Sequence, residues 1–179
     1  MKHIVYLLLS TFIYLPLSAQ KYMTKNGHIS FYSEAPLEKI EAETNMASSV
    51  FDRETKQIAF VVPISSFQFE KPLMQEHFNE NYMETEKYPT STFKGRVKGY
   101  VEEKGKQEVV AEGELNIHGV SRKVNIPGTL EQKEDSIFIQ ASFMTLLKDH
   151  KIKIPKLVFL KIAEEIEVKV NFTYHLYEN

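Results

Sequence analysis

Two stretches of the sequence decide the fold: LMQEHFNENYMETEKYPTSTF at Leu73–Phe93 and GELNIHGVSRKVNIP at Gly113–Pro127. In the first, Met74, Phe78 and Tyr82 lie four residues apart, which places them on one face of a helix. The second alternates apolar and polar residues, which is typical of a strand with one buried face. The two stretches together predict a short amphipathic helix that caps a structure built from strands.

Alternation with a period of two dominates the rest of the chain. Turn signals such as Asn26-Gly27 and Asp52–Thr55 separate the alternating runs. Regularly spaced strands without long helices between them indicate an all-β antiparallel barrel or sandwich. The runs lie at residues 28–33, 39–45, 58–64, 93–101, 109–118, 123–126, 137–143 and 165–174, and the helix lies near residues 72–83.

The N-terminal segment has the layout of a secretory signal peptide. A short basic start precedes an apolar run over residues 4–17, and Ala19 offers a small residue for cleavage before Gln20. The run is shorter than the roughly twenty residues that span a bilayer, so an uncleaved anchor is the weaker alternative. No cysteine is present for lipid attachment. We expect residues 1–19 to be removed and residues 20–179 to form one domain, periplasmic or secreted, without a membrane anchor.

Charge and composition restrict the function classes. The chain carries 22 Lys and Arg against 24 Asp and Glu, and the two signs are interspersed. A nucleic-acid-binding surface favours a basic face, so no nucleic-acid partner is expected. The 12 Phe and 9 Tyr, with no Trp, suit a barrel or sandwich with an aromatic-lined interior.

Searches for catalytic and metal motifs give no candidate. The chain has no cysteine for thiolate chemistry and no serine in a G-x-S-x-G elbow. Asp149 and His150 are adjacent, which does not orient one on the other, so they are expected in a solvated loop. The six histidines lack H-x-x-x-H spacing, and His118 precedes Gly119 at a chain corner, where a turn role is expected. We therefore predict no catalytic residue, no metal site and no cofactor.

The two quoted stretches resemble the signature of the YceI-like family, exported lipocalin-like proteins that hold polyisoprenoid or other long apolar chains. The resemblance covers roughly Phe31 to Tyr174. It implies an extended antiparallel barrel of about eight strands with a lengthwise apolar tunnel for an isoprenoid tail. The matching positions are Leu73, Met74, His77, Phe78, Tyr82, Tyr88, Pro89, Thr92 and Phe93, then Gly113, Leu115, Ile117, His118, Gly119, Val120, Lys123, Val124 and Pro127.

The resemblance implies a binding protein for a polyisoprenoid or similar amphiphilic lipid, and it leaves a homodimer open. The family's later arginine- and glycine-bearing loop appears here as Lys148-Asp149-His150-Lys151, so the shape of the tunnel mouth is expected to differ. The candidate tunnel-lining residues are Phe60, Val62, Phe67, Phe69, Met74, Phe78, Phe93, Val97, Leu115, Ile117, Ile139, Phe143 and Phe172.

Composition alone favours a different interpretation of the same barrel, in which side chains fill the interior and the domain acts through protein partners. An eight-stranded barrel either fills itself or holds one ligand. The volume of its interior distinguishes the two cases, since ligand pockets usually measure about 300–1,000 Å³.

Overall fold

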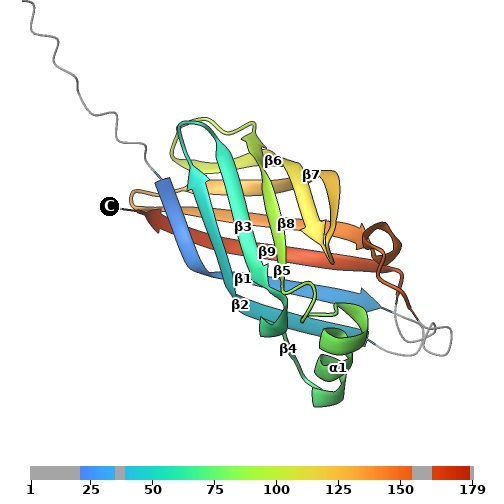
Figure 1. Ribbon diagram of the computed structural model, residues 1–179. Coiled ribbons are helices and arrows are strands. Elements are labelled where there is room, and N and C mark those ends of the chain that lie inside the picture. The colour runs from blue at the N-terminus through green and yellow to red at the C-terminus, as the bar shows by residue number, and fades with distance from the viewer. Residues whose placement is uncertain (1–20, 35–38, 155–162, 178–179) are drawn as a thin grey trace, which may run out of the picture.

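The chain folds into a closed antiparallel barrel (Figure 1). The computed structural model describes residues 21–34, 39–154 and 163–177, so the predicted signal peptide at residues 1–19 lies outside the described part of the chain. The strands are β1 (Lys21–Glu34), β2 (Lys39–Asp52), β3 (Gln57–Pro63), β4 (Gln68–Phe69), β5 (Thr90–Lys98), β6 (Gly105–Ile117), β7 (Val120–Gln132), β8 (Ser136–Leu146) and β9 (Glu165–Leu176).

Eight of these strands form the wall of the barrel. Their hydrogen-bonded order is β1-β9-β8-β7-β6-β5-β3-β2, and β1 also pairs with β2, which closes the ring. The two-residue β4 pairs with β2 outside this ring. Each wall strand overlaps one of the eight alternating runs of the sequence, so the predicted all-β antiparallel barrel is confirmed. The β1–β2 pairing joins the two ends of the sheet.

One predicted turn is wrong, because Asn26-Gly27 lies inside β1. The pairing of β1 with β2 changes register there, from Gly27 opposite Ala47 to Ile29 opposite Thr44. Such a shift is a β-bulge, which bends the strand and increases its twist. Gly27 is needed because a Cβ at this position would lie 2.4 Å from the ring of Phe172. The glycine therefore marks a close approach between the neighbouring strands β1 and β9 and not a chain reversal.

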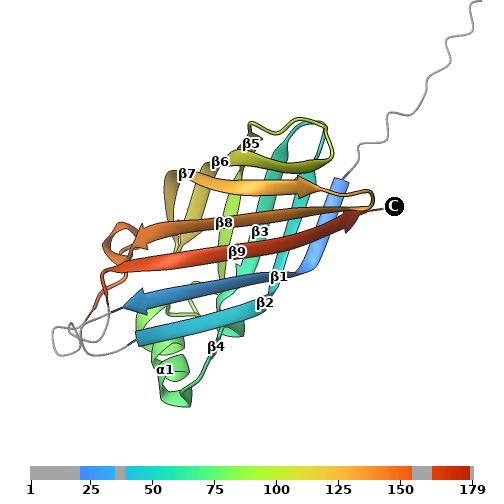
Figure 2. The same ribbon diagram turned by 180° about the vertical axis from the view of Figure 1, so that it is seen from behind.

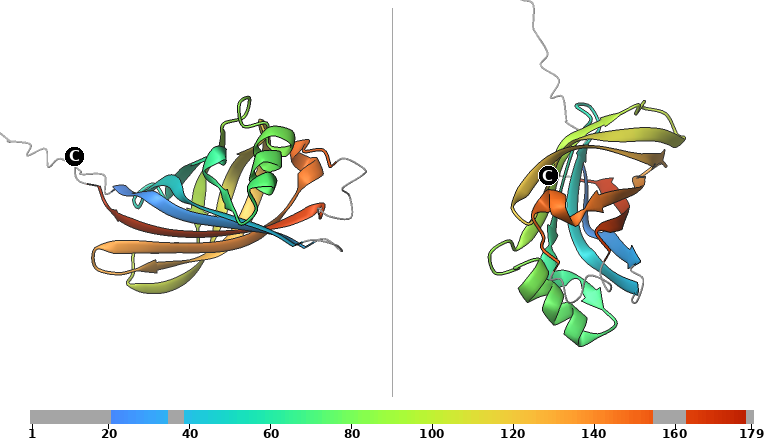
Figure 3. Two further views of the ribbon diagram at one scale, coloured as in Figure 1. Left: turned by 90° about the horizontal axis from the view of Figure 1, so that it is seen from below. Right: turned by 90° about the vertical axis from the view of Figure 1, so that its right-hand side faces the viewer.

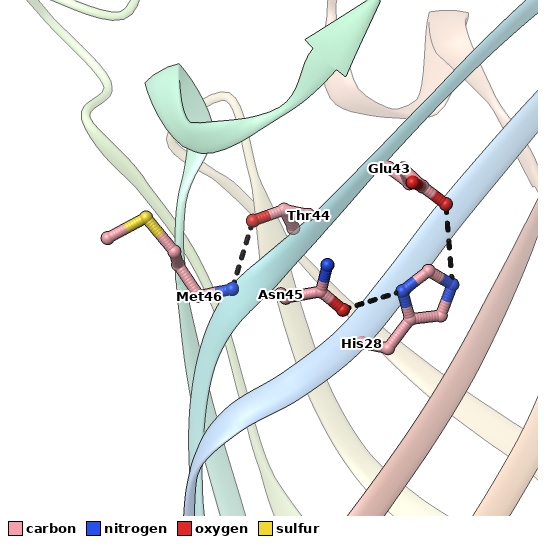
Figure 4. Close-up of polar contacts among 5 residues, drawn as sticks. All are labelled: His28, Glu43, Thr44, Asn45 and Met46. Carbon is pink, nitrogen blue, oxygen red and sulfur yellow. Dashed lines mark hydrogen bonds and ion pairs between the residues drawn. The ribbon is translucent and has the colours of Figure 1, made fainter.

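The polar groups at this bulge are paired with one another (Figure 4). The backbone N–H of Met46 donates to Oγ1 of Thr44 at 3.1 Å. His28 Nδ1 donates to Oδ1 of Asn45 at 3.0 Å, and its Nε2 lies 3.9 Å from Oε2 of Glu43. These contacts stabilise the bend in β1 and β2, the two 14-residue strands of the sheet.

The predicted capping helix is present as α1 (Pro72–His77) followed by a π-helical turn, η2 (Phe78–Tyr82). Pro72 occupies the first position of the helix, where its missing N–H costs nothing. Short 3₁₀ turns form η1 (Ile64–Ser66) and η3 (Leu147–His150). Both α1 and η3 lie at the end of the barrel away from the C-terminus (Figures 1 and 2). Within the described ranges, no helix is long and apolar enough to cross a membrane.

The interior at the C-terminal end is filled by side chains, and we call this region the packed half. Phe51, Tyr100, Leu130, Ile137 and Tyr174 are each at most 1 % exposed. The ring of Phe51 packs edge-on against those of Tyr100 and Tyr174, with centroid distances of 5.5 and 6.4 Å. The Tyr100 hydroxyl donates to Gln132 Oε1 at 2.9 Å, and burial raises the pKa of Tyr100 to about 12.

Candidate functional site

The interior at the helix-capped end holds an apolar cavity of about 170 Å³, and we call this region the hollow half. Its walls come from β1, β2, β3, β5, β6, β8 and β9, and from β4 and the three short helical turns. The strands wrap around this interior, with α1 at the barrel end (Figure 3). The polar members of the lining are Ser33, Ser91, Tyr82, Thr145 and His150, and the remaining side chains are aliphatic, methionine or phenylalanine. Such a surface offers almost no directional contact and suits a hydrocarbon.

Four phenylalanine rings form a cluster on one wall of the apolar cavity. Phe31 of β1 lies 5.3, 5.8 and 5.5 Å from Phe67, Phe69 and Phe78, measured between ring centroids. Phe78 also contacts Phe67 at 5.8 Å and Phe69 at 5.0 Å. Because Phe69 belongs to β4 and Phe78 to η2, this cluster joins the capping elements to the barrel wall. The sequence between β3 and β5 therefore supplies three of the four rings.

Eight of the thirteen predicted tunnel residues line the apolar cavity. They come from β3, the η1–β4 segment, η2, β6 and β8, and they meet although up to 83 residues separate them in sequence, from Phe60 to Phe143. Their contact with a ligand stays a prediction. The eight are Phe60, Val62, Phe67, Phe69, Phe78, Leu115, Ile117 and Phe143.

The other five predicted residues do not line this cavity: Met74, Phe93, Val97, Ile139 and Phe172. The last four are buried but lie in the filled core, where Phe93 stacks on Phe60 at 5.5 Å and Phe172 packs against Tyr174 at 6.0 Å. Alternation identifies the inward face of a strand and says nothing of depth along the barrel axis. Met74 is half-buried on α1, one α-helical turn before Phe78, but its side chain does not reach the cavity.

The sequence analysis did not predict several residues that line the apolar cavity. Ile166, Val168 and Val170 of β9 line the cavity and share the alternating face of Phe172, so the same sequence signal applies to them. Ile152 and His150 follow β8 in an irregular segment, where no periodicity was available to identify them.

The η3 turn closes a gap in the barrel wall. Strand β7 pairs with β8 only over Gly128–Gln132, and its first half is bridged instead by η3. Arg122 Nε donates to the carbonyl oxygen of Asp149 at 2.8 Å, and His150 Nδ1 donates to that of Val120 at 3.1 Å. The expectation of a solvated Asp149-His150 loop is therefore wrong, since His150 is 3 % exposed. Burial lowers the pKa of His150 and keeps its ring neutral.

A second, polar cavity of about 390 Å³ adjoins the hollow half. His118 lies there at the β6–β7 turn with φ of 52°, as its predicted turn role requires. Its Nδ1 donates to the carbonyl oxygen of His150 at 3.2 Å, and its Nε2 lies 2.9 Å from Glu84 Oε2. The lining consists of Asn81, Tyr82, Glu84, Tyr88, His118, Gly119, Val120, Lys151 and Lys153. Among the described residues, no group of three or more His, Asp or Glu side chains is arranged to hold a metal ion.

Comparison with protein families identifies the domain. The YceI-like domain matches residues 21–174, nearly the whole described chain. The chain belongs to the YceI-like family. A comparison with the sequences of curated proteins finds no match.

Solved structures share the fold of this YceI-like chain at low sequence identity. A polyisoprenoid-binding domain from Saccharophagus degradans, implicated in plant cell wall breakdown, is 13 % identical with a TM-score of 0.76, over 89 % of this chain and 99 % of that one. BcnA from Burkholderia cenocepacia is 15 % identical with a TM-score of 0.70, over 82 % and 95 %. The Campylobacter jejuni YceI protein is 17 % identical with a TM-score of 0.63, over 76 % and 85 %.

Proposed function

We propose that the chain is an exported, non-enzymatic binding protein whose apolar cavity holds the hydrocarbon part of an amphiphilic lipid, of the polyisoprenoid or a similar class. The observation that carries this proposal is the cavity itself, an apolar space inside a closed barrel. The family membership and a polyisoprenoid-binding structural neighbour support the same class of ligand.

The volume limits how much of a lipid the cavity holds in this conformation. About 170 Å³ is close to the roughly 150 Å³ of an engineered apolar cavity that binds benzene. Each methylene group withdrawn from water contributes about 0.8 kcal/mol, so even a short buried stretch stabilises a complex. A longer chain requires the four-phenylalanine cluster to rearrange. Phe31, Phe69 and Phe78 are only half-buried, so three of its rings have solvent on one side.

The small volume also favours a second candidate, a barrel whose side chains fill the interior and whose partners are proteins. The cavity falls below the usual range of ligand pockets, about 300–1,000 Å³. In this case the phenylalanine cluster is a structural core and not a displaceable lining.

Mass spectrometry of an organic extract from the purified protein distinguishes the two candidates. We expect a lipid at a fixed molar ratio to the protein, absent from a filled barrel protein purified from the same cells. The matched variant is Val168→Phe, which places a ring in the cavity and should lower the lipid recovered without unfolding the chain. Recovery of no lipid above the control would reject the lipid-binding proposal and leave the filled barrel.

Export is part of the proposal and has its own test. We expect the mature protein to begin at Gln20 and to appear in the periplasmic or secreted fraction. N-terminal sequencing of protein from each cell fraction measures this. A mature chain that retains Met1 in the cytoplasmic fraction would contradict export and leave the binding proposal unaffected.

A further inference from the structure

We propose that the rings of Phe60, Phe93 and Phe172 form a plug that closes the inner end of the apolar cavity and limits the length of the hydrocarbon chain that the barrel accepts. This inference rests on the proposed lipid-binding function and adds selectivity for chain length to it. It follows from the level at which the cavity ends, from the contacts between the three rings, and from wall glycines that make room for two of them.

The apolar cavity ends at the same level on strands from different sides of the barrel. On β9, Val170 lines the cavity, whereas Phe172, the next inward residue, is 2 % exposed and does not line it. On β3 and β5, Phe60 and Phe93 lie opposite each other in register, and only Phe60 lines the cavity. One inward position beyond Phe172, Tyr174 is fully buried in the packed half. The boundary between the two halves therefore coincides with the three rings.

The three rings contact one another across the interior of the barrel. Phe60 of β3 stacks on Phe93 of the neighbouring strand β5, with a centroid distance of 5.5 Å and an interplanar angle of 16°. Phe60 also meets Phe172 of β9 edge-on, with a centroid distance of 5.9 Å. Because β1 and β2 lie between β9 and β3 in the ring of strands, this second contact crosses the interior. The rings therefore form one continuous layer from β5 to β9.

Glycines in the barrel wall make room for two of the rings. Gly95 of β5 and Gly113 of β6 lie opposite each other in register, and a Cβ on either would lie 2.7 or 2.8 Å from Cζ of Phe93. A Cβ on Gly27 would lie 2.4 Å from the ring of Phe172. Because a Cβ cannot approach so closely, a side chain at any of these positions would displace a ring. Both rings therefore lie against the wall in places that only glycine leaves open.

The capped end of the apolar cavity is packed less tightly than the plug. Phe31, Phe69 and Phe78 of the four-phenylalanine cluster are half-buried, whereas Phe93 and Phe172 are at most 2 % exposed. Neither α1 nor η2 contains a buried residue. A hydrocarbon chain therefore meets adaptable rings at the capped end and fixed rings at the inner end, so the inner end sets the limit on length.

The volume between the plug and the cluster corresponds to a short chain. About 170 Å³ is comparable to an engineered cavity of about 150 Å³ that binds benzene, so on the order of six carbon atoms fit there. Each methylene group that enters apolar space should increase affinity by about fourfold. A methylene group that finds no further space adds nothing. The plug therefore predicts that affinity stops rising at a short chain length, and that removing one of its rings raises this length.

The test compares ligands that share one head group and differ only in chain length. Hexanol, octanol, decanol, dodecanol and tetradecanol are titrated into the full mature protein. The plug variant is Phe172→Ala, and the matched control is Phe51→Ala, which removes an equally buried ring that lies behind the plug and does not line the cavity. Phe172→Leu and Phe51→Leu repeat the comparison with a smaller loss of core volume, so that the test does not depend on the folding of the alanine variants.

For the wild type and the Phe51 variants, we expect affinity to rise about fourfold per methylene group up to one chain length and then to stop rising. For Phe172→Ala, that length should increase by roughly four carbons, so tetradecanol should bind at least about tenfold more tightly than to the wild type. An unchanged length in both Phe172 variants, an equal increase in the Phe51 variants, or a wild type whose affinity still rises up to tetradecanol would each overturn the plug inference alone. Failure of every alcohol to bind would overturn the proposed function as well.

Discussion

The two halves of one barrel interior share strands such as β2, β8 and β9 but differ in how tightly their side chains pack. In the packed half, Phe51, Tyr100 and Tyr174 interlock with Leu130 and Ile137, and each is at most 1 % exposed. In the hollow half, side chains of seven strands and of the capping segments surround about 170 Å³ of apolar space. The difference arises where capping segments replace strand pairing, because η2, β4 and η3 reach into the hollow half only. We therefore expect the packed half to contribute more to stability and the hollow half to be the more adaptable part of the interior.

The largest expected effect is a difference in stability between matched phenylalanine truncations in the two halves. Phe51→Ala should lower the free energy of unfolding by about 3–5 kcal/mol, since a fully buried ring leaves a cavity that tight neighbours cannot fill. Phe78→Ala should lower it by about 1–2 kcal/mol, because that ring is half-buried and adjoins space already empty. Urea unfolding measures both losses, provided that the slope of the unfolding free energy against urea concentration stays unchanged. Equal losses would show that the hollow half is as rigid as the packed half.

Enlarging a side chain should also affect the two halves differently. Val97→Phe should cost about 1–3 kcal/mol, because Val97 is 2 % exposed in a filled region and the larger ring strains its neighbours. Val168→Phe should change stability by less than about 1 kcal/mol, because its side chain borders the apolar cavity. Thermal unfolding of the two variants beside the wild type measures the difference. A costly Val168→Phe would mean that the cavity is closed to added volume, which would favour the filled-barrel candidate.

The sequence predicted the strands and the family well and predicted the division between the halves poorly. Alternation located every wall strand, since the inward face of a strand is a local property. Phe60 and Phe172 satisfied that signal equally, yet only Phe60 lines the cavity, and their rings are 5.9 Å apart. Depth along the barrel depends on strand register, which is set by the bulge at Gly27 and by partners far away in sequence. Local patterns do not contain that information.

The polar parts of the hollow half were the least predictable. The sequence predicted His150 to be a solvated loop residue because no periodic pattern surrounds it. Its side chain is buried because η3 occupies the place where β7 and β8 do not pair. Lys151 and Lys153 have no local signal either, since their alternation with Ile152 is too short to distinguish from chance. Both features depend on where the β6–β7 turn meets η3, a contact between segments about thirty residues apart.

A smaller effect should appear in the pH dependence of the hollow half. Burial lowers the pKa of His150 in the folded chain, so the unfolded chain binds this proton first, near the usual value of about 6.5. The stability that neutral His150 contributes is therefore present above that pH and is lost as the pH falls below it. The packed half should not respond in this range, because burial raises the pKa of both Tyr100 and Tyr174.

The measurement compares urea unfolding of the wild type and His150→Asn from about pH 7.5 to about pH 5. Asparagine retains a donor near the position of Nδ1, which donates to the Val120 carbonyl. The wild type should lose more stability than the variant on acidification, whereas groups common to both proteins cancel. Parallel curves would show that His150 is solvated enough to titrate normally.

Removal of a single hydroxyl group should have opposite effects on stability in the two halves. Ser91 lines the apolar cavity, and its buried hydroxyl has no hydrogen-bond partner among the described residues. Ser91→Ala should therefore raise the free energy of unfolding by up to about 1 kcal/mol. Ser49 in the packed half donates to the carbonyl oxygen of Ala59 at 2.8 Å and lies 2.8 Å from the Tyr174 hydroxyl, so Ser49→Ala should lower it by about 1–2 kcal/mol. A loss at Ser91 would mean that its hydroxyl is satisfied inside the cavity, as it would be by a polar atom of a bound molecule retained through purification. If so, after extraction with organic solvent and refolding, Ser91→Ala should raise the free energy of unfolding.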